Sequence, residues 1–156
     1  MSKLHLNTNS IFEKIKLGIL GIGNQGSMYS KKLLANECPE FTLVAICDRN
    51  PARIAWAKEN LGQEIACFDN AEAMLDSGMV DACIVAVPHY DHPKYAVACM
   101  ERGIHVLVEK PAGVYTLQVR EMNEEADRHP ELAFALMYFI LNYTRIGTYC
   151  SAIGSN

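Results

Sequence analysis

The chain has 156 residues, of which 50% are apolar and 21% carry a charge. This length predicts one globular domain, which would bury roughly 70% of the surface that the unfolded chain exposes. The composition excludes a disordered or collagen-like protein. With 14 Lys and Arg against 18 Asp and Glu, the net charge is −4. This charge argues against nucleic acid as a partner, because nucleic-acid binders usually carry a basic patch.

The cysteines and the N-terminus indicate a protein of the cytoplasm. None of the six cysteines stands in a Cys-x-x-Cys pair or at another short metal-type spacing, so we expect buried, reduced thiols and no metal site. Glu13, Lys14 and Lys16 interrupt the apolar residues near the N-terminus, and a signal peptide is therefore not expected. The longest apolar run, Leu132–Leu141, has ten residues. Because this is about half of a bilayer span, no membrane segment is expected.

From residue 15 onward the chain alternates two periodicities. Short apolar runs predict buried parallel strands at Ile15–Leu20, Thr42–Cys47, Ala82–Val87, Ile104–Val108 and Leu132–Met137, with a weaker one at Glu64–Phe68. Amphipathic stretches between them predict helices at Gln25–Asn36, Pro51–Asn60, Ala71–Asp76, His92–Arg102 and Thr116–Arg128. Asn50 as N-cap, Pro51 at the first helical position and Gly103 after the fourth helix are strong boundary signals.

The repetition of strand, helix and strand predicts the fold class. Parallel strands need crossover connections, and these are right-handed, so helices cover both faces of the sheet. We predict an α/β fold with a doubly wound parallel sheet (Rossmann fold), forming a single three-layer αβα domain over residues 13–138. Residues 1–12 are interpreted as an N-terminal extension. Residues 139–156 form an atypical tail, because they lack helical periodicity and carry one charged residue, Arg145.

A glycine-rich turn follows the first predicted strand. Gly21, Gly23 and Gly26 form the pattern G-x-G-x-x-G, with Asn24 and Gln25 inside it. In a dinucleotide site the first glycine permits the tight turn, the second lets the backbone approach a pyrophosphate, and the third lets the helix pack on the sheet. The helix that starts here points its free N–H groups at the phosphates. Because the pattern follows a strand and opens a helix, it predicts a dinucleotide-binding turn.

Asp48 stands at the end of the second predicted strand, 22 residues beyond Gly26. A carboxylate at this place accepts hydrogen bonds from the adenosine ribose. Alternatively Asp48 caps the next helix, although Asn50 and Pro51 already occupy those positions. The acidic group repels a 2′-phosphate and favours NAD, whereas Arg49 beside it can accommodate that phosphate or lie along the adenine. We therefore expect NAD as the cofactor and leave NADP open.

Two further loops follow the fourth and fifth predicted strands. Pro88, His89 and His92 lie in the first loop, and Glu109 and Lys110 lie in the second. Ligands of open α/β sheets lie outside the carboxyl ends of the strands, so both loops are expected near the ligand. Lys110 can orient or shuttle the proton of a hydroxyl that is being oxidised. It can equally be a solvated lysine paired with Glu109, and His92 can be simply a residue of the first helical turn.

Taken together, these motifs resemble the N-terminal half of the glucose–fructose oxidoreductase / inositol dehydrogenase / rhizopine-catabolism family (Gfo/Idh/MocA). They occur in family order at Gly21–Gly26, Asp48–Arg49, Pro88–His92 and Gly103–Pro111. The Glu-Lys-Pro that closes the last of them is the most specific. The resemblance covers roughly residues 13–138 and implies NAD(P)-dependent hydride transfer at a CH–OH carbon of a sugar, cyclitol or similar polyol.

The same resemblance implies a role for each candidate residue. Lys110 would be the catalytic residue that contacts the reacting hydroxyl, and Glu109 would help to hold its loop. Pro88 and His92 would line the nicotinamide side. Further cofactor contacts would come from Gly21, Gly23, Asn24, Gln25, Gly26, Asp48, Arg49 and His89. The bond between Lys110 and Pro111 is left open as cis or trans.

The end of the chain departs from the family pattern. Family members continue into a second α/β domain that carries the substrate-binding residues and an acid/base pair, and residues 139–156 do not resemble its start. We therefore expect a truncated, frame-shifted or fragmentary chain that is poorly active alone. The alternative is a non-catalytic NAD-binding or redox-sensing module that acts through a protein partner at Phe139–Leu141. A methyltransferase fold is disfavoured by Glu109 to Pro111, and the apolar region Leu132–Leu141 is expected to promote self-association.

Overall fold

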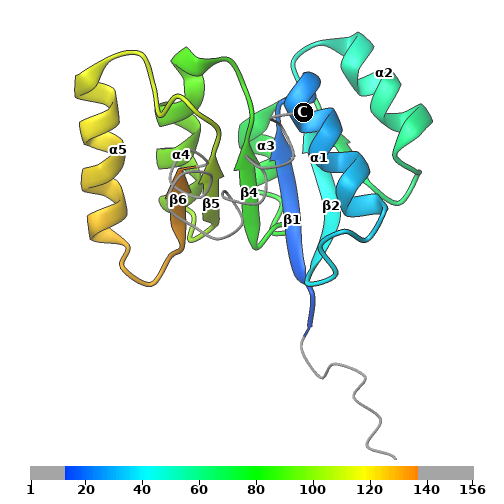
Figure 1. Ribbon diagram of the computed structural model, residues 1–156, viewed down its shortest axis with the longest axis horizontal. Helices are drawn as coiled ribbons and strands as arrows, with labels where there is room; N and C mark the ends of the chain where they lie inside the picture. The colour runs from blue at the N-terminus through cyan, green and yellow to red at the C-terminus, as the bar shows by residue number, and fades with distance from the viewer. Residues whose placement is uncertain (1–12, 137–156) are drawn as a thin grey trace, which may run out of the picture.

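A six-stranded parallel sheet forms the centre of the computed structural model, which describes residues 13–136 (Figure 1). The strand order is β3-β2-β1-β4-β5-β6, and every neighbouring pair is parallel. The strands are β1 (Ile15–Leu20), β2 (Phe41–Cys47), β3 (Ala66–Phe68), β4 (Ala82–Val85), β5 (His105–Val108) and β6 (Phe134–Leu136). The chain runs outward from β1 in one direction and then returns to run outward in the other, so the strand order reverses between β1 and β4.

Helices cover both faces of this sheet, which confirms the predicted three-layer Rossmann architecture. The helices are α1 (Asn24–Leu34), α2 (Pro51–Asn60), α3 (Ala71–Leu75), α4 (His92–Met100) and α5 (Thr116–Arg128), with a short 3₁₀ turn, η1 (His89–Asp91), before α4. One apolar cluster contains residues of α1 and α2, and the other contains residues of α3, α4 and α5. Each face of the sheet therefore has its own helical layer. Within residues 13–136 there is no helix with the length and apolar character that crossing a membrane requires.

Local capping signals explain where several helices begin and end. The Asn50 side chain accepts a hydrogen bond from the backbone N–H of Ala52 at 2.9 Å, and Pro51 opens α2. Asn70 caps α3 in the same way. Gly103 follows α4 with φ of +71°, a left-handed conformation that favours glycine at a helix end. The boundary signals predicted at Asn50, Pro51 and Gly103 are confirmed.

Some element boundaries differ from the prediction. β4 ends at Val85 and not at Val87, because its neighbour β1 turns away from the sheet at Gly21, where φ is +93°. The helix predicted to end at Arg102 stops at Met100, and the final strand begins at Phe134 instead of at Leu132. The expectations for residues 1–12 and 137–156, which include the N-terminal extension, the atypical tail and the apolar surface at 139–141, lie outside the described residues.

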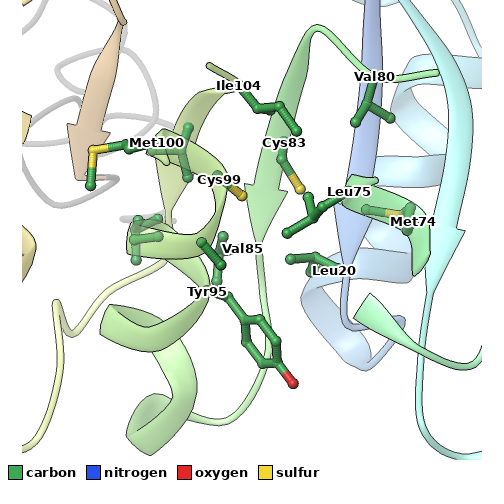
Figure 2. Packing of buried hydrophobic residues seen from close by; sticks show 14 of the residues in the cluster. Leu20, Met74, Leu75, Val80, Cys83, Val85, Tyr95, Cys99, Met100 and Ile104 are labelled. Carbon is green, nitrogen blue, oxygen red and sulfur yellow. The ribbon is translucent and has the colours of Figure 1, made fainter. Parts of the chain in front are cut away.

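The larger apolar cluster lies where α3, α4 and α5 pack on β1, β4 and β5. Figure 2 shows labelled members of this cluster, among them Leu20, Met74, Val85, Tyr95 and Met100. Cys83 and Cys99 are buried in it as free thiols, as predicted for cysteines that behave as small apolar side chains. Cys38 is also free, but it is exposed.

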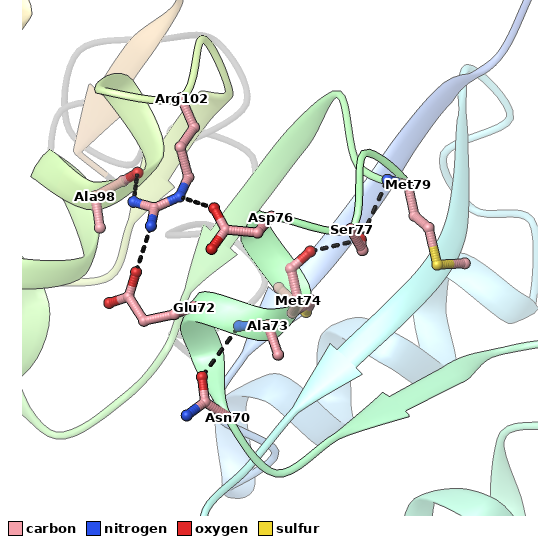
Figure 3. A network of polar contacts seen from close by, with 9 residues as sticks. All are labelled: Asn70, Glu72, Ala73, Met74, Asp76, Ser77, Met79, Ala98 and Arg102. Atoms are coloured by element: carbon pink, nitrogen blue, oxygen red, sulfur yellow. Dashed lines mark hydrogen bonds and ion pairs between the residues drawn. The ribbon is translucent and has the colours of Figure 1, made fainter.

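A polar clasp joins α3 to the end of α4 (Figure 3). The guanidinium group of Arg102 donates hydrogen bonds at 2.6 Å to both Glu72 and Asp76 and at 3.0 Å to the carbonyl oxygen of Ala98. The hydrogen bond and charge of Arg102 hold the pKa of Asp76 below its usual range. Arg102 immediately precedes the loop into β5. Its hydrogen bonds connect α3 with the end of α4 and therefore support the fold.

Candidate functional site

Two adjoining pockets open at the carboxyl ends of the strands, where the strand order reverses. The first has a volume of about 520 Å³ and the second about 280 Å³, and both are lined by Ala86 and Val87 just beyond β4. The first pocket is also lined by Leu20, Gly21, Gly23, Cys47, Asp48, Arg49, Asn50, Arg53, Ala71, Pro88 and Tyr95. The second is also lined by Asn24, Gln25, His89, His92, Glu109 and Lys110. All of the predicted site residues except Gly26 thus line one of these two adjoining pockets.

The glycine-rich turn forms the wall where the two pockets approach the start of α1. A Cβ atom on Gly21 would lie 2.6 Å from the carbonyl oxygen of Ala86, and one on Gly26 would lie 1.8 Å from the carbonyl oxygen of Gly21. Neither approach leaves room for a side chain. A Cβ on Gly23 would meet nothing within 4 Å. Gly21 and Gly26 therefore serve the packing of the turn, whereas the space above Gly23 is open to a ligand.

Both carboxylate oxygens of Asp48 accept backbone hydrogen bonds. Oδ2 accepts from the N–H of Ile22 at 2.8 Å, and Oδ1 accepts from the N–H of Asn50 at 2.8 Å. The carboxylate thus ties the end of β2 to the glycine-rich turn on one side and to the cap of α2 on the other. Each carboxylate oxygen has further acceptor capacity, so a ribose hydroxyl can still bind. The capping alternative raised from the sequence describes part of what Asp48 does.

Two arginines line the first pocket beside Asp48. Arg49 is largely exposed and pairs with Asp91 at 3.2 Å. Arg53 lies in the first turn of α2 and makes no ion pair or side-chain hydrogen bond to any residue of the described 13–136 range. Sequence reasoning singled out Arg49 and missed Arg53. The available signal was the strong helix start at Pro51, which places the third helical residue beside the end of β2.

Lys110 and Glu109 occupy the far end of the second pocket. Glu109 is buried, and its Oε2 accepts a hydrogen bond from the backbone N–H of Lys110 at 3.0 Å. Its Oε1 accepts a hydrogen bond from the hydroxyl of Tyr29 on α1. The peptide bond between Lys110 and Pro111 is cis. The Lys110 side chain is exposed and forms no ion pair within residues 13–136, so the alternative in which it pairs with Glu109 is wrong for this structure.

Tyr29 was missed by sequence reasoning, although it is the nearest partner of the Glu109 side chain. Burial, followed by the hydrogen bond and the charge of Glu109, raises the pKa of the Tyr29 phenol above its usual range. The phenol therefore stays protonated and continues to donate to the carboxylate. The two residues are 80 positions apart, and no local pattern links them.

His92 is almost fully buried, with 1% of its surface exposed. Its Nδ1 lies 2.7 Å from the carbonyl oxygen of Pro111, and its Nε2 lies 2.8 Å from the carbonyl oxygen of Val87. The ring thus bridges the loop after β4 and the loop after β5. Both ring nitrogens face protein carbonyl groups, so the His92 ring shapes the second pocket, and the exposed His89 beside it is the more accessible imidazole.

Comparison with known proteins agrees with the geometry of these pockets. Residues 15–136 match the family described as an oxidoreductase family with an NAD-binding Rossmann fold. The chain is 29% identical over 117 residues to the rhizopine catabolism protein MocA of Rhizobium meliloti, covering 74% of this chain and 35% of that protein. It is 30% identical over 120 residues to a myo-inositol 2-dehydrogenase of Thermotoga maritima, covering 77% of this chain and 35% of that enzyme.

Solved structures show the same likeness. The structure superposes on scyllo-inositol dehydrogenase from Lactobacillus casei, crystallised with NAD(H) and scyllo-inositol, with a TM-score of 0.79 and 26% identity. That match covers 90% of this chain and 41% of the dehydrogenase. The chain therefore spans about a third of the length of the curated relatives it matches.

Proposed function

The chain belongs to the oxidoreductase family with an NAD-binding Rossmann fold, and from this premise we propose that it binds NAD(H) across the two adjoining pockets. The adenosine half would lie in the first pocket, with its ribose at Asp48 and the adenine near Arg49. The pyrophosphate would cross the glycine-rich turn above Gly23, where a side chain is missing and the space is open. The nicotinamide would enter the second pocket beside His89 and His92, next to Pro88 of the first pocket.

One observation carries this proposal. The two pockets share Ala86 and Val87 as lining residues, and their other lining residues extend from Asp48 to Lys110 across the point where the strand order reverses. Ligands of open α/β sheets bind at such a reversal, and the first βα turn carries the pyrophosphate. Asn24 and Gln25 begin α1 at the junction. Their backbone N–H groups belong to the free N-terminal donors of α1 and are suited to the phosphate oxygens.

Lys110 is the residue that we assign to catalysis. Its ammonium group is exposed at the second pocket, while its backbone is held by Glu109 on one side and by the His92 bridge to Pro111 on the other. The ammonium group would hydrogen-bond the hydroxyl of a sugar or polyol and help to move its proton. The bound nicotinamide supplies the hydride acceptor. The relatives' names, which include inositol dehydrogenases, support the substrate class.

The complete reaction would need more than residues 13–136. Relatives are about three times as long as the matched segment. We therefore expect the 156-residue chain to bind cofactor and to turn over polyols very poorly. A location in the cytoplasm is part of the proposal, supported by the five free cysteines within the described residues.

Titration of NADH fluorescence tests the proposal directly. The folded chain is expected to bind NADH with a dissociation constant in the micromolar to millimolar range, and Lys110→Met is expected to leave that constant almost unchanged. Addition of myo-inositol is expected to give little or no absorbance change at 340 nm with NAD. A folded sample that leaves NADH fluorescence unaltered at millimolar concentration would contradict the cofactor assignment.

A second candidate function is a redox-sensing module that binds NAD(H) and acts through a protein partner. It is favoured by exposed apolar side chains: the rings of Tyr90 and Tyr115 lie 6.3 Å apart, and Leu117 is 66% exposed. Such surfaces mark protein interaction sites when they are contiguous. A monomer whose mass in light scattering stays the same with and without NADH, and that captures no partner, would count against this function.

A further inference from the structure

A buried carboxylate of the second pocket, Glu109, has no cation beside it among the described residues. It is 5% exposed and forms no ion pair within residues 13–136. Its Oε1 accepts a hydrogen bond from the hydroxyl of Tyr29, and its Oε2 accepts one from the backbone N–H of Lys110 at 3.0 Å. A buried charge is costly unless it is both paired and hydrogen-bonded. The Glu109 carboxylate therefore attracts any cation that can reach it.

The ammonium group of Lys110 is well placed to reach this carboxylate. Lys110 is the next residue in the chain, and both residues line the second pocket. Its side chain is exposed, and its flexible stem can turn the ammonium group toward a neighbouring carboxylate. No such pair forms in the part of the chain that the structure describes. The two charges share one pocket but stay apart, so another group must hold the carboxylate.

Tyr29 on α1 is the side chain that holds it. Its half-buried ring packs against the apolar cluster that contains Leu17, Ile19 and Ile22. This packing fixes the ring, while the hydroxyl donates to Glu109, 80 positions away in the chain. Burial, followed by the hydrogen bond and the charge of Glu109, raises the pKa of the phenol above its usual range. The hydroxyl therefore keeps its proton and remains a donor to the carboxylate.

We propose that Tyr29 is a positioning residue, which holds the Glu109 carboxylate away from the Lys110 ammonium group and so keeps that group free for the substrate hydroxyl. Without the Tyr29 hydroxyl, Glu109 turns toward Lys110 and forms the ion pair. An ammonium group held by a carboxylate is kept in its charged form and has fewer donors left for a hydroxyl. The inference rests on the proposed function for the role of Lys110, whereas the contact between Tyr29 and Glu109 needs no cofactor.

The rate at which N-hydroxysuccinimidyl acetate acetylates Lys110 at pH 8, followed by mass spectrometry, tests this role. Only the uncharged amine reacts. In Tyr29→Phe the rate at Lys110 is expected to fall roughly three- to tenfold, because an ion pair favours the charged form. Lys94, an exposed lysine of α4 outside both pockets, is the internal reference, and its rate is expected to stay the same. Circular dichroism checks the fold, and Tyr29→Leu, which also lacks the hydroxyl, replaces a Phe variant that does not fold.

Glu109→Gln tests whether the carboxylate is the cause. In a chain that carries Glu109→Gln there is no charge to capture Lys110, so adding Tyr29→Phe is expected to leave the Lys110 rate unchanged. An unaltered rate in Tyr29→Phe alone would overturn the positioning role. An equal fall with and without Glu109→Gln would also overturn it, because the loop itself would then have moved. The acetylation rates are measured without cofactor, so they decide the role of Tyr29 separately from the NADH titration that decides the proposed function.

Discussion

The carboxylate that lines the first pocket is fixed by backbone hydrogen bonds, whereas the lysine that we propose for catalysis in the second pocket has an exposed side chain on a fixed backbone. In the first pocket Asp48 is fixed by the backbone of Ile22 and Asn50. In the second, Glu109 and His92 are buried and fully engaged, but the Lys110 side chain is exposed. A binding surface can be made of fixed backbone and carboxylate groups. Proton transfer needs a side chain with a free polar end, held at its base.

Substitution of the glycines is expected to give the largest change in stability. It also distinguishes a glycine needed for packing, Gly26, from one proposed to leave space for the cofactor, Gly23. Gly26→Ala is expected to lower the free energy of unfolding by roughly 3 kcal/mol, because its Cβ would overlap the carbonyl oxygen of Gly21 and the backbone must move. Gly23→Ala has space for its Cβ, so its stability is expected to stay within about 1 kcal/mol of wild type. Its NADH affinity should nevertheless fall, because the methyl group occupies the space proposed for the pyrophosphate.

Urea unfolding and NADH titration measure these two quantities. Equal stability of Gly23→Ala and Gly26→Ala would contradict the separation. So would a Gly23→Ala variant that binds NADH as tightly as wild type does.

The His92→Phe variant tests whether the His92 ring holds together the two loops that line the second pocket. The phenyl ring fills similar space but leaves the carbonyl groups of Val87 and Pro111 without their partner, and the expected loss is about 2 kcal/mol of unfolding free energy. His89→Phe, at an exposed position, is expected to change stability by less than about 0.5 kcal/mol. Similar losses in the two variants, measured by urea unfolding, would mean that the His92 bridge does not hold the loops.

Tyr29→Phe tests the donor that holds Glu109. At neutral pH the variant is expected to be about 1 kcal/mol less stable, because a buried carboxylate loses one hydrogen bond. The pKa of Tyr29 is raised in the folded state, so above pH of about 10 the unfolded chain releases this proton first. Stability is therefore lost as pH rises beyond that value, and the Tyr29 contribution is fully present below it.

The measurement for Tyr29 is unfolding free energy as a function of pH. The difference between wild type and Tyr29→Phe is expected to be constant up to about pH 10 and to shrink above it. Tyr115→Phe, at an exposed ring, is the control and should follow wild type throughout. A difference that is unchanged in alkali would show that Tyr29 ionises normally.

The smallest effect is expected for Arg102→Met, which breaks the clasp between α3 and α4. Because the pKa of Asp76 is held low by Arg102, the contribution of this pair is present above the usual pKa of an aspartate and is lost as pH falls through the lowered value. The variant should therefore be slightly less stable than wild type at neutral pH and equal to it in strong acid. NADH affinity should not change, since Arg102 lies outside both pockets. Weakened NADH binding would mean that the scaffold and the site are coupled.

The fold was predictable because each of its signals is local. Alternating apolar runs and amphipathic stretches, together with Asn50, Pro51 and Gly103, are read over a few neighbouring residues, and the structure confirms the elements they imply. Boundaries that depend on a neighbouring strand were less predictable. β4 stops at Val85 because β1 turns away at Gly21, and that partnership is not visible in the β4 sequence.

For the candidate site, too, the positions of residues could be predicted from local sequence, but their contacts could not. Residues at the ends of strands, such as Asp48 and Lys110, could be placed at one edge of the sheet because the carboxyl ends of parallel strands meet there. Their partners could not be assigned. The contact between Tyr29 and Glu109 and the His92 bridge join segments that are distant in sequence. A helix face and a histidine in a first turn carry no sign of such contacts before the chain is folded.

The reversal of strand order also determines when the chain becomes able to bind. β1 is the first described strand, but it lies between β2 and β4. One edge of β1 therefore stays unpaired until β4, which comes more than 60 residues later in the chain, has joined the sheet. Contacts of this sequence separation form slowly, because a long loop must close first. The first pocket takes its walls from residues after β1, β2 and β4, so it exists only when both halves of the sheet have met. NADH can therefore stabilise the finished domain by mass action, but it gives no help to the folding of the first half.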